Sequence, residues 1–113
     1  MDCIFCRIVA GEIPADIVFQ DKELLAFRDI NPQAPTHILI IPKTHIPSLS
    51  DISSKHGALM GRIIILAKEL AIKEGISEKG YRLAASTGPD GGQLVPHVHF
   101  HLIGGRKLSG DLG

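Results

Sequence analysis

A chain of 113 residues with 44% hydrophobic and 21% charged residues has the length and composition of one globular domain, which we expect to span residues 1–113. Twelve basic residues balance twelve acidic ones, so nothing in the charge predicts nucleic acid or an anionic membrane as the main partner. The sequence has no apolar run near the roughly 20 residues of a membrane span and no signal-peptide pattern, and we therefore expect a cytoplasmic protein.

The first half of the chain predicts a short helix followed by three strands. The apolar segment 2–11, DCIFCRIVAG, ends at a glycine and predicts the helix. DIVFQD (16–21) and ELLAFRDI (23–30) predict two strands joined by a tight charged turn. The prolines of NPQAP (31–35) indicate a loop, and THILII (36–41) predicts a third, strongly apolar strand.

One long helix is predicted to begin near Ser53 or Ser54 and to stop at Gly75. Its apolar residues recur at helical spacing in two adjacent stripes, namely Leu59, Ile63, Leu66 and Leu70, and Met60, Ile64, Ala67 and Ala71. This surface is wider than one sheet face can bury. It fits either a deep core helix or a subunit interface, and we favour the interface.

Two further strands are predicted at residues 81–86 (YRLAAS) and 97–103 (HVHFHLI), around a loop at residues 87–96. The element order β-β-β-α-β-β after a short helix predicts an α+β fold. We expect a five-stranded antiparallel sheet with the long helix on one face.

The last of these strands carries three histidines at alternate positions. Strict alternation with apolar residues puts His97, His99 and His101 on one face of the strand. At about 3.3 Å per residue, the outer two stand roughly 13 Å apart, which is too far for one metal ion with bonds of about 2 Å. The row therefore requires a longer ligand, or different roles for its members.

The glycine-rich loop TGPDGGQ (87–93) before this strand points to a phosphate site. Without side chains, its glycines let backbone N–H groups approach anionic oxygens closely. The central histidine, His99, can attack phosphorus and form a covalent phosphohistidine. The sequence has neither a Walker A motif nor an acidic magnesium cluster, which argues against a kinase-like mechanism.

Cys3 and Cys6 are the two cysteines of the chain, at CxxC spacing. In a reducing compartment this spacing indicates metal or redox chemistry more than a structural disulfide. Two free thiols in the first helix remain an alternative. A catalytic redox pair is less favoured, because no thioredoxin-like βαβ pattern surrounds the motif.

Taken together, these residues resemble a known family. HVHFHLI matches the histidine-triad pattern, and residues 4–46 and 79–106 are similar to the histidine triad nucleotide-binding branch of that superfamily, most clearly in FRDINPQAPTHILIIPK and DGGQ. The resemblance implies a homodimer whose sheets join into one ten-stranded sheet. It also implies hydrolysis of adenosine 5′-phosphoramidate and related purine nucleoside phosphoramidates through a nucleotidyl-histidine, with no cofactor required for catalysis.

By this resemblance, His99 would be the nucleophile, oriented by the backbone carbonyl of His97. His101 would contact the phosphate. His37, which matches the fourth family histidine, would help to protonate the leaving amine. Asp29 would accept hydrogen bonds from the ribose hydroxyls.

The resemblance also implies the other substrate-binding positions: Phe5, Ile8, Phe27, Ile30 and Leu39 around the base, and Ser86, Gly92, Gln93 and Leu94 near the phosphate. Ser86 stands where this branch usually has asparagine, and Leu94 where serine is common. Both replacements shorten the polar reach around the phosphate, so we expect them to affect rate and leaving-group preference.

Some bacterial relatives carry CxxC at this place, and the resemblance to them implies a structural zinc held by Cys3, Cys6, His45 and His97. Two cysteines and two histidines are a common tetrahedral set. Two alternative functions remain: a nucleotide-binding regulatory module with little turnover, and a zinc-binding protein whose triad serves metal alone. The length of the histidine row argues against the second.

Overall fold

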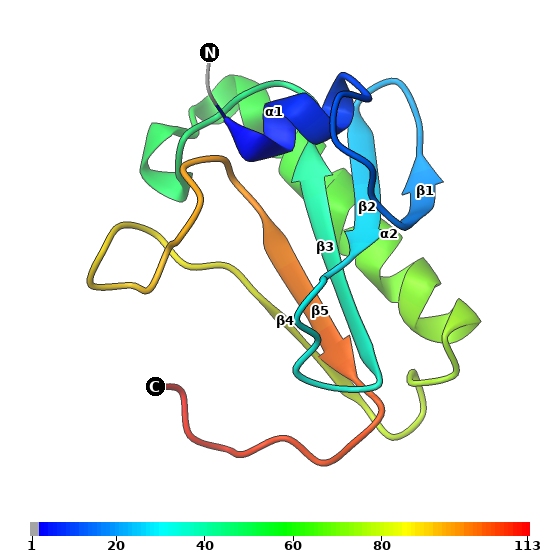
Figure 1. The fold of residues 1–113 in the computed structure, drawn as a ribbon. Helices are drawn as coiled ribbons and strands as arrows, with labels where there is room; N and C mark the ends of the chain where they lie inside the picture. Colours follow the sequence, from blue (N-terminus) through cyan, green and yellow to red (C-terminus); the bar gives the residue numbers. More distant parts are fainter. Residues whose placement is uncertain (1–2) are drawn as a thin grey trace.

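The structure, a computed structural model, describes residues 3–113 (Figure 1). Its elements, in chain order, are α1 (Ile4–Val9), β1 (Ile17–Gln20), β2 (Leu24–Arg28), β3 (Thr36–Pro42), two short 3₁₀ turns (Leu49–Asp51 and Ser54–His56), α2 (Gly57–Lys73), β4 (Tyr81–Ala84) and β5 (Phe100–Gly104). The predicted element order is confirmed. Among the described residues, no helix has the length and apolar character needed to cross a membrane.

The five strands form one antiparallel sheet in the order β1-β2-β3-β5-β4. The predicted α+β class is therefore confirmed, with the long helix on one face of the sheet. The central strand β3 is buried along its whole length, because both faces of the sheet are covered.

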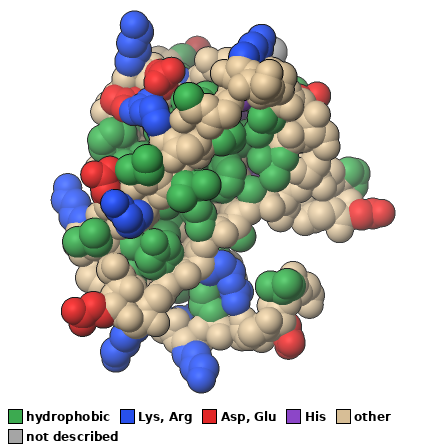
Figure 2. Space-filling view, turned by 180° about the vertical axis from the view of Figure 1, so that it is seen from behind, with side chains coloured by type: hydrophobic (Ala, Val, Ile, Leu, Met, Phe, Trp, Pro, Cys, Tyr) green, Lys and Arg blue, Asp and Glu red, His purple; other side chains and the backbone are tan. Residues whose placement is uncertain are grey.

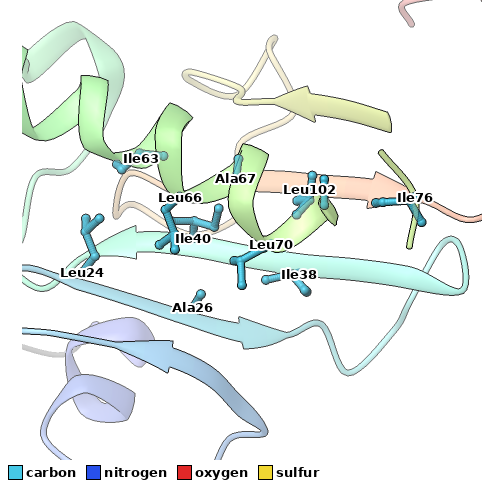
Figure 3. Close-up of a cluster of buried hydrophobic side chains, with 11 residues drawn as sticks. Leu24, Ala26, Ile38, Ile40, Ile63, Leu66, Ala67, Leu70, Ile76 and Leu102 are labelled. Carbon is cyan, nitrogen blue, oxygen red and sulfur yellow. The ribbon is translucent and has the colours of Figure 1, made fainter. Parts of the chain in front are cut away.

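Side-chain alternation divides the interior into two clusters. On one face, Ile38 and Ile40 of β3 and Leu102 of β5 pack against α2 (Figure 3). On the other face, Leu39 and Ile41 of β3 pack against α1. The helix-side cluster holds Leu24, Ala26, Ile38, Ile40, Ile63, Leu66, Ala67, Leu70, Ala71, Ile76 and Leu102. The fold is thus supported mainly from the α2 face, while the α1 face carries the histidines described below.

Helix α2 begins at Gly57, three to four residues later than predicted. Residues Ser54–His56 form a tighter 3₁₀ turn instead, in which the His56 N–H donates to the Ser53 carbonyl at 2.9 Å and His56 Nδ1 accepts the Ser53 N–H at 3.0 Å. The predicted end is confirmed, because Gly75 adopts the left-handed conformation with φ +76° just beyond the helix.

Part of the outer face of α2 is apolar. Ile64, Ile65 and Ile72 are 57%, 55% and 61% exposed, whereas Ile63 and Leu66 are buried against the sheet. Seen from the side that carries α2, hydrophobic side chains are grouped at the surface and histidines are almost absent (Figure 2). The helix therefore has more apolar surface than this chain alone covers.

Strand β5 is shorter than predicted, since it begins at Phe100 and not at His97. The ladder with β3 ends at the pair Ile40 and Phe100. Farther along, β3 reaches Pro42, which has no N–H to donate. Val98 donates its N–H to the Ile46 carbonyl at 2.7 Å, so the segment before β5 is held from outside the sheet.

Candidate active site and metal cluster

The sheet register builds one wall of the site. Phe27 of β2 pairs with Leu39 of β3, which in turn pairs with His101 of β5. Directly opposed residues of antiparallel strands share a face, so these three side chains form a row on the α1 side. The predicted common face of the triad is confirmed: the Phe5 ring contacts the His97 and His99 rings at centroid distances of 5.8 and 5.2 Å, and the His99 ring lies 5.1 Å from that of His101.

His99 is held in a single orientation by the chain before β5. Its Nδ1 lies 2.7 Å from the carbonyl oxygen of His97, which can only accept, so Nδ1 carries the proton. In the neutral ring, Nε2 then keeps its lone pair, and no partner for it occurs within residues 3–113. A buried imidazole with a fixed, unshared lone pair has the properties of a nucleophile.

His101 and His37 form a hydrogen-bonded pair beside it. His37 Nε2 lies 2.9 Å from His101 Nδ1 and 3.4 Å from Asp29 Oδ2. Burial lowers the pKa of His37, although the Asp29 carboxylate opposes that shift. Burial, together with repulsion from the neighbouring histidines, lowers the pKa of His101 to about 4. Both rings are therefore neutral at pH 7.

The predicted base pocket is gathered only in part. Phe5, Phe27 and Leu39 are buried in one cluster with Ile8 packed against it, and the Phe5 and Phe27 rings meet edge to face at 5.6 Å. Ile30, in contrast, is 91% exposed and belongs to neither cluster.

Asp29, expected at the ribose, stands between β2 and the histidine pair. Its Oδ1 accepts the Asn31 N–H at 2.8 Å, and its Oδ2 faces His37 Nε2 at 3.4 Å. Each oxygen of the Asp29 carboxylate has a further lone pair that these two contacts do not use, and it could accept a hydrogen bond from a ribose hydroxyl.

The glycine-rich loop is braced by the side chain of Gln93. Its Oε1 accepts the Gly88 N–H at 2.9 Å, and its Nε2 donates to the carbonyls of Pro47 and Val95 at 2.7 and 2.9 Å. The amide is thus bonded to backbone at both ends, which makes Gln93 a brace of the loop. Gly92 adopts φ +87°, a conformation that side chains disfavour.

The backbone N–H groups of Gly92 and Gln93, expected to cradle phosphate, donate within the loop to the carbonyls of Pro89 and Gly88. The Leu94 N–H finds no partner among the described residues, and its side chain is 91% exposed. Ser86 is half-buried. Of the three predicted cradle N–H groups, only that of Leu94 is left without an acceptor among the described residues.

The four predicted metal ligands do meet. Cys3 Sγ lies 3.4 Å from His97 Nδ1, Cys6 Sγ lies 3.3 Å from His45 Nδ1 and 3.7 Å from His97 Nδ1, and the two histidine nitrogens are 3.2 Å apart. A tetrahedral zinc with bonds of about 2.0–2.3 Å requires ligand separations of about 3.3–3.8 Å. The donor set and its spacing therefore fit zinc.

The surroundings of the cluster agree with this. His97 Nε2 donates to the Pro42 carbonyl at 2.8 Å, which leaves Nδ1 unprotonated and turned to the cluster, as a metal-ligating histidine requires. Cys3 and Cys6 are free thiols, and burial and the hydrogen bond with Cys3 raise the pKa of Cys6. A metal ion binds cysteine as the thiolate, so zinc at this cluster would oppose the raised pKa of Cys6.

Some groups that shape the site act through the backbone and have no sequence signal. The carbonyls of Pro42 and Ile46 are examples, because any residue offers a carbonyl. The resemblance predicts Gln93 as a contact of the substrate and gives no signal for the three bonds by which its side chain braces the loop. Thr87 Oγ1 is the one buried side-chain N or O atom of the described residues without a hydrogen-bond partner.

Comparison with known proteins gives consistent matches. Residues 10–108 match the HIT domain family. The purine nucleoside phosphoramidase of Escherichia coli (strain K12) is 54% identical over 107 residues, which cover 95% of this chain and 90% of that protein. The structure of a HIT family hydrolase from Legionella pneumophila Philadelphia 1 has a TM-score of 0.97 at 54% identity, covering 99% of this chain and 100% of that one.

A zinc-bound histidine triad family protein from Mycobacterium smegmatis has a TM-score of 0.81 at 34% identity, covering 94% of this chain and 76% of that one. The family match, the extent of identity and the arrangement of the triad agree: this chain belongs to the HIT domain family and is a hydrolase of that family.

Proposed function

We propose that this protein hydrolyses purine nucleoside phosphoramidates of the adenosine 5′-phosphoramidate type through a covalent nucleotidyl-His99. The observation that carries the proposal is the hydrogen bond from His99 Nδ1 to the His97 carbonyl, which leaves Nε2 as the nucleophilic atom. The 54% identity with a purine nucleoside phosphoramidase supports the substrate class.

The reaction follows from these positions in two steps. His99 Nε2 attacks phosphorus, a bond from nitrogen to phosphorus forms, and the bond from phosphorus to the amine breaks as the amine takes up one proton from the solvent. Water then attacks the nucleotidyl-histidine and releases the nucleotide with loss of one proton, so the two steps balance and restore the neutral imidazole. His101 donates to a phosphoryl oxygen, and His37 assists through its contact with His101 Nδ1.

The same proposal assigns the binding groups. Phe5, Phe27 and Leu39 offer apolar surface to a purine, and Asp29 holds the ribose. The Leu94 N–H donates to the phosphate. The exposed side chains of Leu94 and Ile30 lie at the surface, where they can meet the leaving group or solvent.

A fluorogenic adenosine phosphoramidate tests the function. The wild-type protein should turn it over, and brief incubation should give a mass increase of one adenylyl group on His99. His99→Ala should abolish turnover while retaining nucleotide binding. His56→Ala, a histidine at the start of α2, should behave as wild type. Tight nucleotide binding by the wild type without turnover would contradict the enzyme and leave a nucleotide-binding regulatory module.

We further propose that Cys3, Cys6, His45 and His97 hold one structural zinc. The ligand separations support this, as does the zinc-bound relative. Bound zinc would tie α1 to the segment before β5, and the proposed reaction passes no step through it. His97 then serves both sites, with its ring on the metal and its carbonyl on His99.

A homodimer is the third part of the proposal. The exposed isoleucines of α2, Ile64, Ile65 and Ile72, are apolar surface that a second copy would bury. Sedimentation at micromolar concentration should give about twice the chain mass of 12.2 kDa. A monomer under these conditions would contradict the proposal.

A further inference from the structure

The loop between β2 and β3 is held by hydrogen bonds of its backbone and of its Asp29 and Gln33 side chains. The Asp29 N–H donates to the His37 carbonyl at 2.9 Å, and the Asn31 N–H donates to Asp29 Oδ1 at 2.8 Å. The Gln33 side-chain amide donates to the Asn31 carbonyl at 3.1 Å. These bonds give the Gln33 backbone a defined position against the His37 ring.

One bond from this loop determines where His37 carries its proton. The Gln33 N–H donates to His37 Nδ1 at 3.0 Å. A ring nitrogen that accepts a hydrogen bond has no proton of its own, so the neutral ring carries its proton on Nε2. If His37 were protonated on Nδ1, that N–H would face the Gln33 N–H, and two donors would lie within hydrogen-bond distance without an acceptor.

The effect passes to His101. His37 Nε2–H points to His101 Nδ1 at 2.9 Å, so Nδ1 accepts and His101 carries its proton on Nε2. Within residues 3–113 no partner for His101 Nε2 is found. A neutral ring that gave up this proton would become an imidazolate, and His101 is therefore a hydrogen-bond donor in this state and not a proton source.

The same bond argues against a cation among Asp29, His37 and His101, although their ligand atoms lie within 4.8 Å of one another. A metal on His37 Nε2 would require Nδ1 to carry the proton, as it does in most metal-ligating histidines. The Gln33 N–H occupies that position. The three groups thus form a hydrogen-bonded set.

The loop is anchored from the far end of β5. Arg106 donates from Nε to the Gln33 carbonyl at 3.0 Å and from an Nη atom to the Lys107 carbonyl at 3.2 Å. Gly105 adopts φ +95°, and a Cβ there would lie 2.9 Å from Cβ of Pro35. The glycine lets the chain approach the loop closely enough for Arg106 to reach it.

We propose that Arg106 and the Gln33 backbone N–H are positioning groups that fix the proton of His101 on Nε2, where it faces the phosphoryl group. The order of contacts is Arg106, the Gln33 backbone (its carbonyl toward Arg106 and its N–H toward His37), the His37 ring and the His101 ring. The inference rests on the proposed function in which His101 binds phosphate. Neither positioning group touches the substrate.

The direct test determines which ring nitrogen of each histidine carries the proton in the wild-type protein. Long-range ¹H–¹⁵N correlation spectra of the full chain with labelled histidine, at pH 7, distinguish the two neutral forms and the cation of each ring. We expect His37 and His101 to be protonated on Nε2 and His99 on Nδ1. A His37 ring protonated on Nδ1, alone or in addition to Nε2, overturns the inference.

Variants test the anchor. Arg106→Gln should give His37 a mixture of neutral forms and lower kcat on the order of tenfold, less than the loss of a whole donor. The control is Arg82→Gln, because Arg82 also donates to a backbone carbonyl, that of Ser109, away from this loop. Equal spectra and rates in the two variants overturn the role of Arg106.

Gln33→Pro removes the N–H itself, and Gln33→Ala retains it. If the proline variant folds, His37 should lose its preference for Nε2, and an unchanged preference overturns the inference. If it does not fold, the wild-type spectrum and Arg106→Gln still decide. An absence of turnover with the expected proton positions would contradict the proposed function and leave this inference standing.

Discussion

His101 and Leu102 are neighbours in β5 whose side chains lie on opposite faces of the sheet. Replacing Leu102 by alanine should mainly lower stability, whereas replacing His101 by alanine should mainly lower turnover. Leu102 is fully buried between β3, β4 and α2, where it pairs with Ile38 and Leu83. Truncation of a buried leucine costs about 2–5 kcal/mol, and complete burial favours about 3–4 kcal/mol for Leu102→Ala. For 113 residues the entropy of unfolding is about 0.24 kcal/mol per kelvin, so the melting temperature should fall by about 12–17 °C.

His101→Ala removes one hydrogen bond, to His37 Nε2, which still has Asp29 Oδ2 at 3.4 Å as an acceptor. The loss in the free energy of unfolding should be about 1 kcal/mol, or about 4 °C. Turnover should fall by about a hundredfold or more, because a donor to the phosphoryl group is lost.

Calorimetry and turnover at 15 °C, where both variants remain folded, give the two measurements. Leu102→Ala should retain wild-type kcat within a few-fold. Two results would refute the assignment of the two sheet faces. One is a decrease in melting temperature of less than about 4 °C for Leu102→Ala. The other is a decrease for His101→Ala that exceeds the decrease for Leu102→Ala.

Three further outcomes are expected. Zinc at one equivalent per chain should be found by elemental analysis, and Cys3→Ser should remove it and lower the melting temperature, since metal binding is coupled to folding; equal melting temperatures would leave Cys3 as an ordinary buried thiol. Asp29→Ala should weaken the binding of ribonucleotides more than the binding of 2′,3′-dideoxy nucleotides in calorimetric titrations. Equal losses of affinity for both would exclude a ribose contact. The pKa of His101 is about 4 in the folded chain against 6.5 for the ordinary group, so below pH 6.5 the unfolded chain binds the proton first and stability falls as the pH drops toward 4. Urea melts between pH 7 and 4.5 should show a shallower fall for His101→Phe, and parallel curves would refute this contribution.

Alternation and helical spacing predicted both α-helices and all five strands, because both patterns are local, but not the two 3₁₀ turns. The two largest boundary differences, at the starts of β5 and α2, depend on specific hydrogen bonds, one with a distant residue and one within a local turn. Val98 leaves the sheet to bond the Ile46 carbonyl, and His56 bonds Ser53 and tightens the chain before α2. Neither contact follows from the spacing of apolar residues.

The candidate site shows the same division. The triad could be placed on one face from its spacing alone, whereas the metal set came from resemblance, since His45 and His97 are 52 residues apart. The contact of His99 Nδ1 with the His97 carbonyl was implied by the resemblance. Other contacts through backbone atoms were not predictable, because every residue carries a carbonyl and nearly all carry an N–H. The bond from Gln33 to His37 belongs to that group.

The three bonds of the Gln93 side chain have a consequence for the energetics of binding. The Gly88 end of the loop, the Val95 carbonyl and the Pro47 carbonyl are held by one amide, so this loop is ordered when the chain folds. The loop would therefore lose little conformational entropy when a phosphate binds. Less of the binding energy is then used to order the loop, and the affinity is higher. Gln93→Ala should shift that entropy loss to the binding step and weaken phosphate binding without removing any group that contacts phosphate.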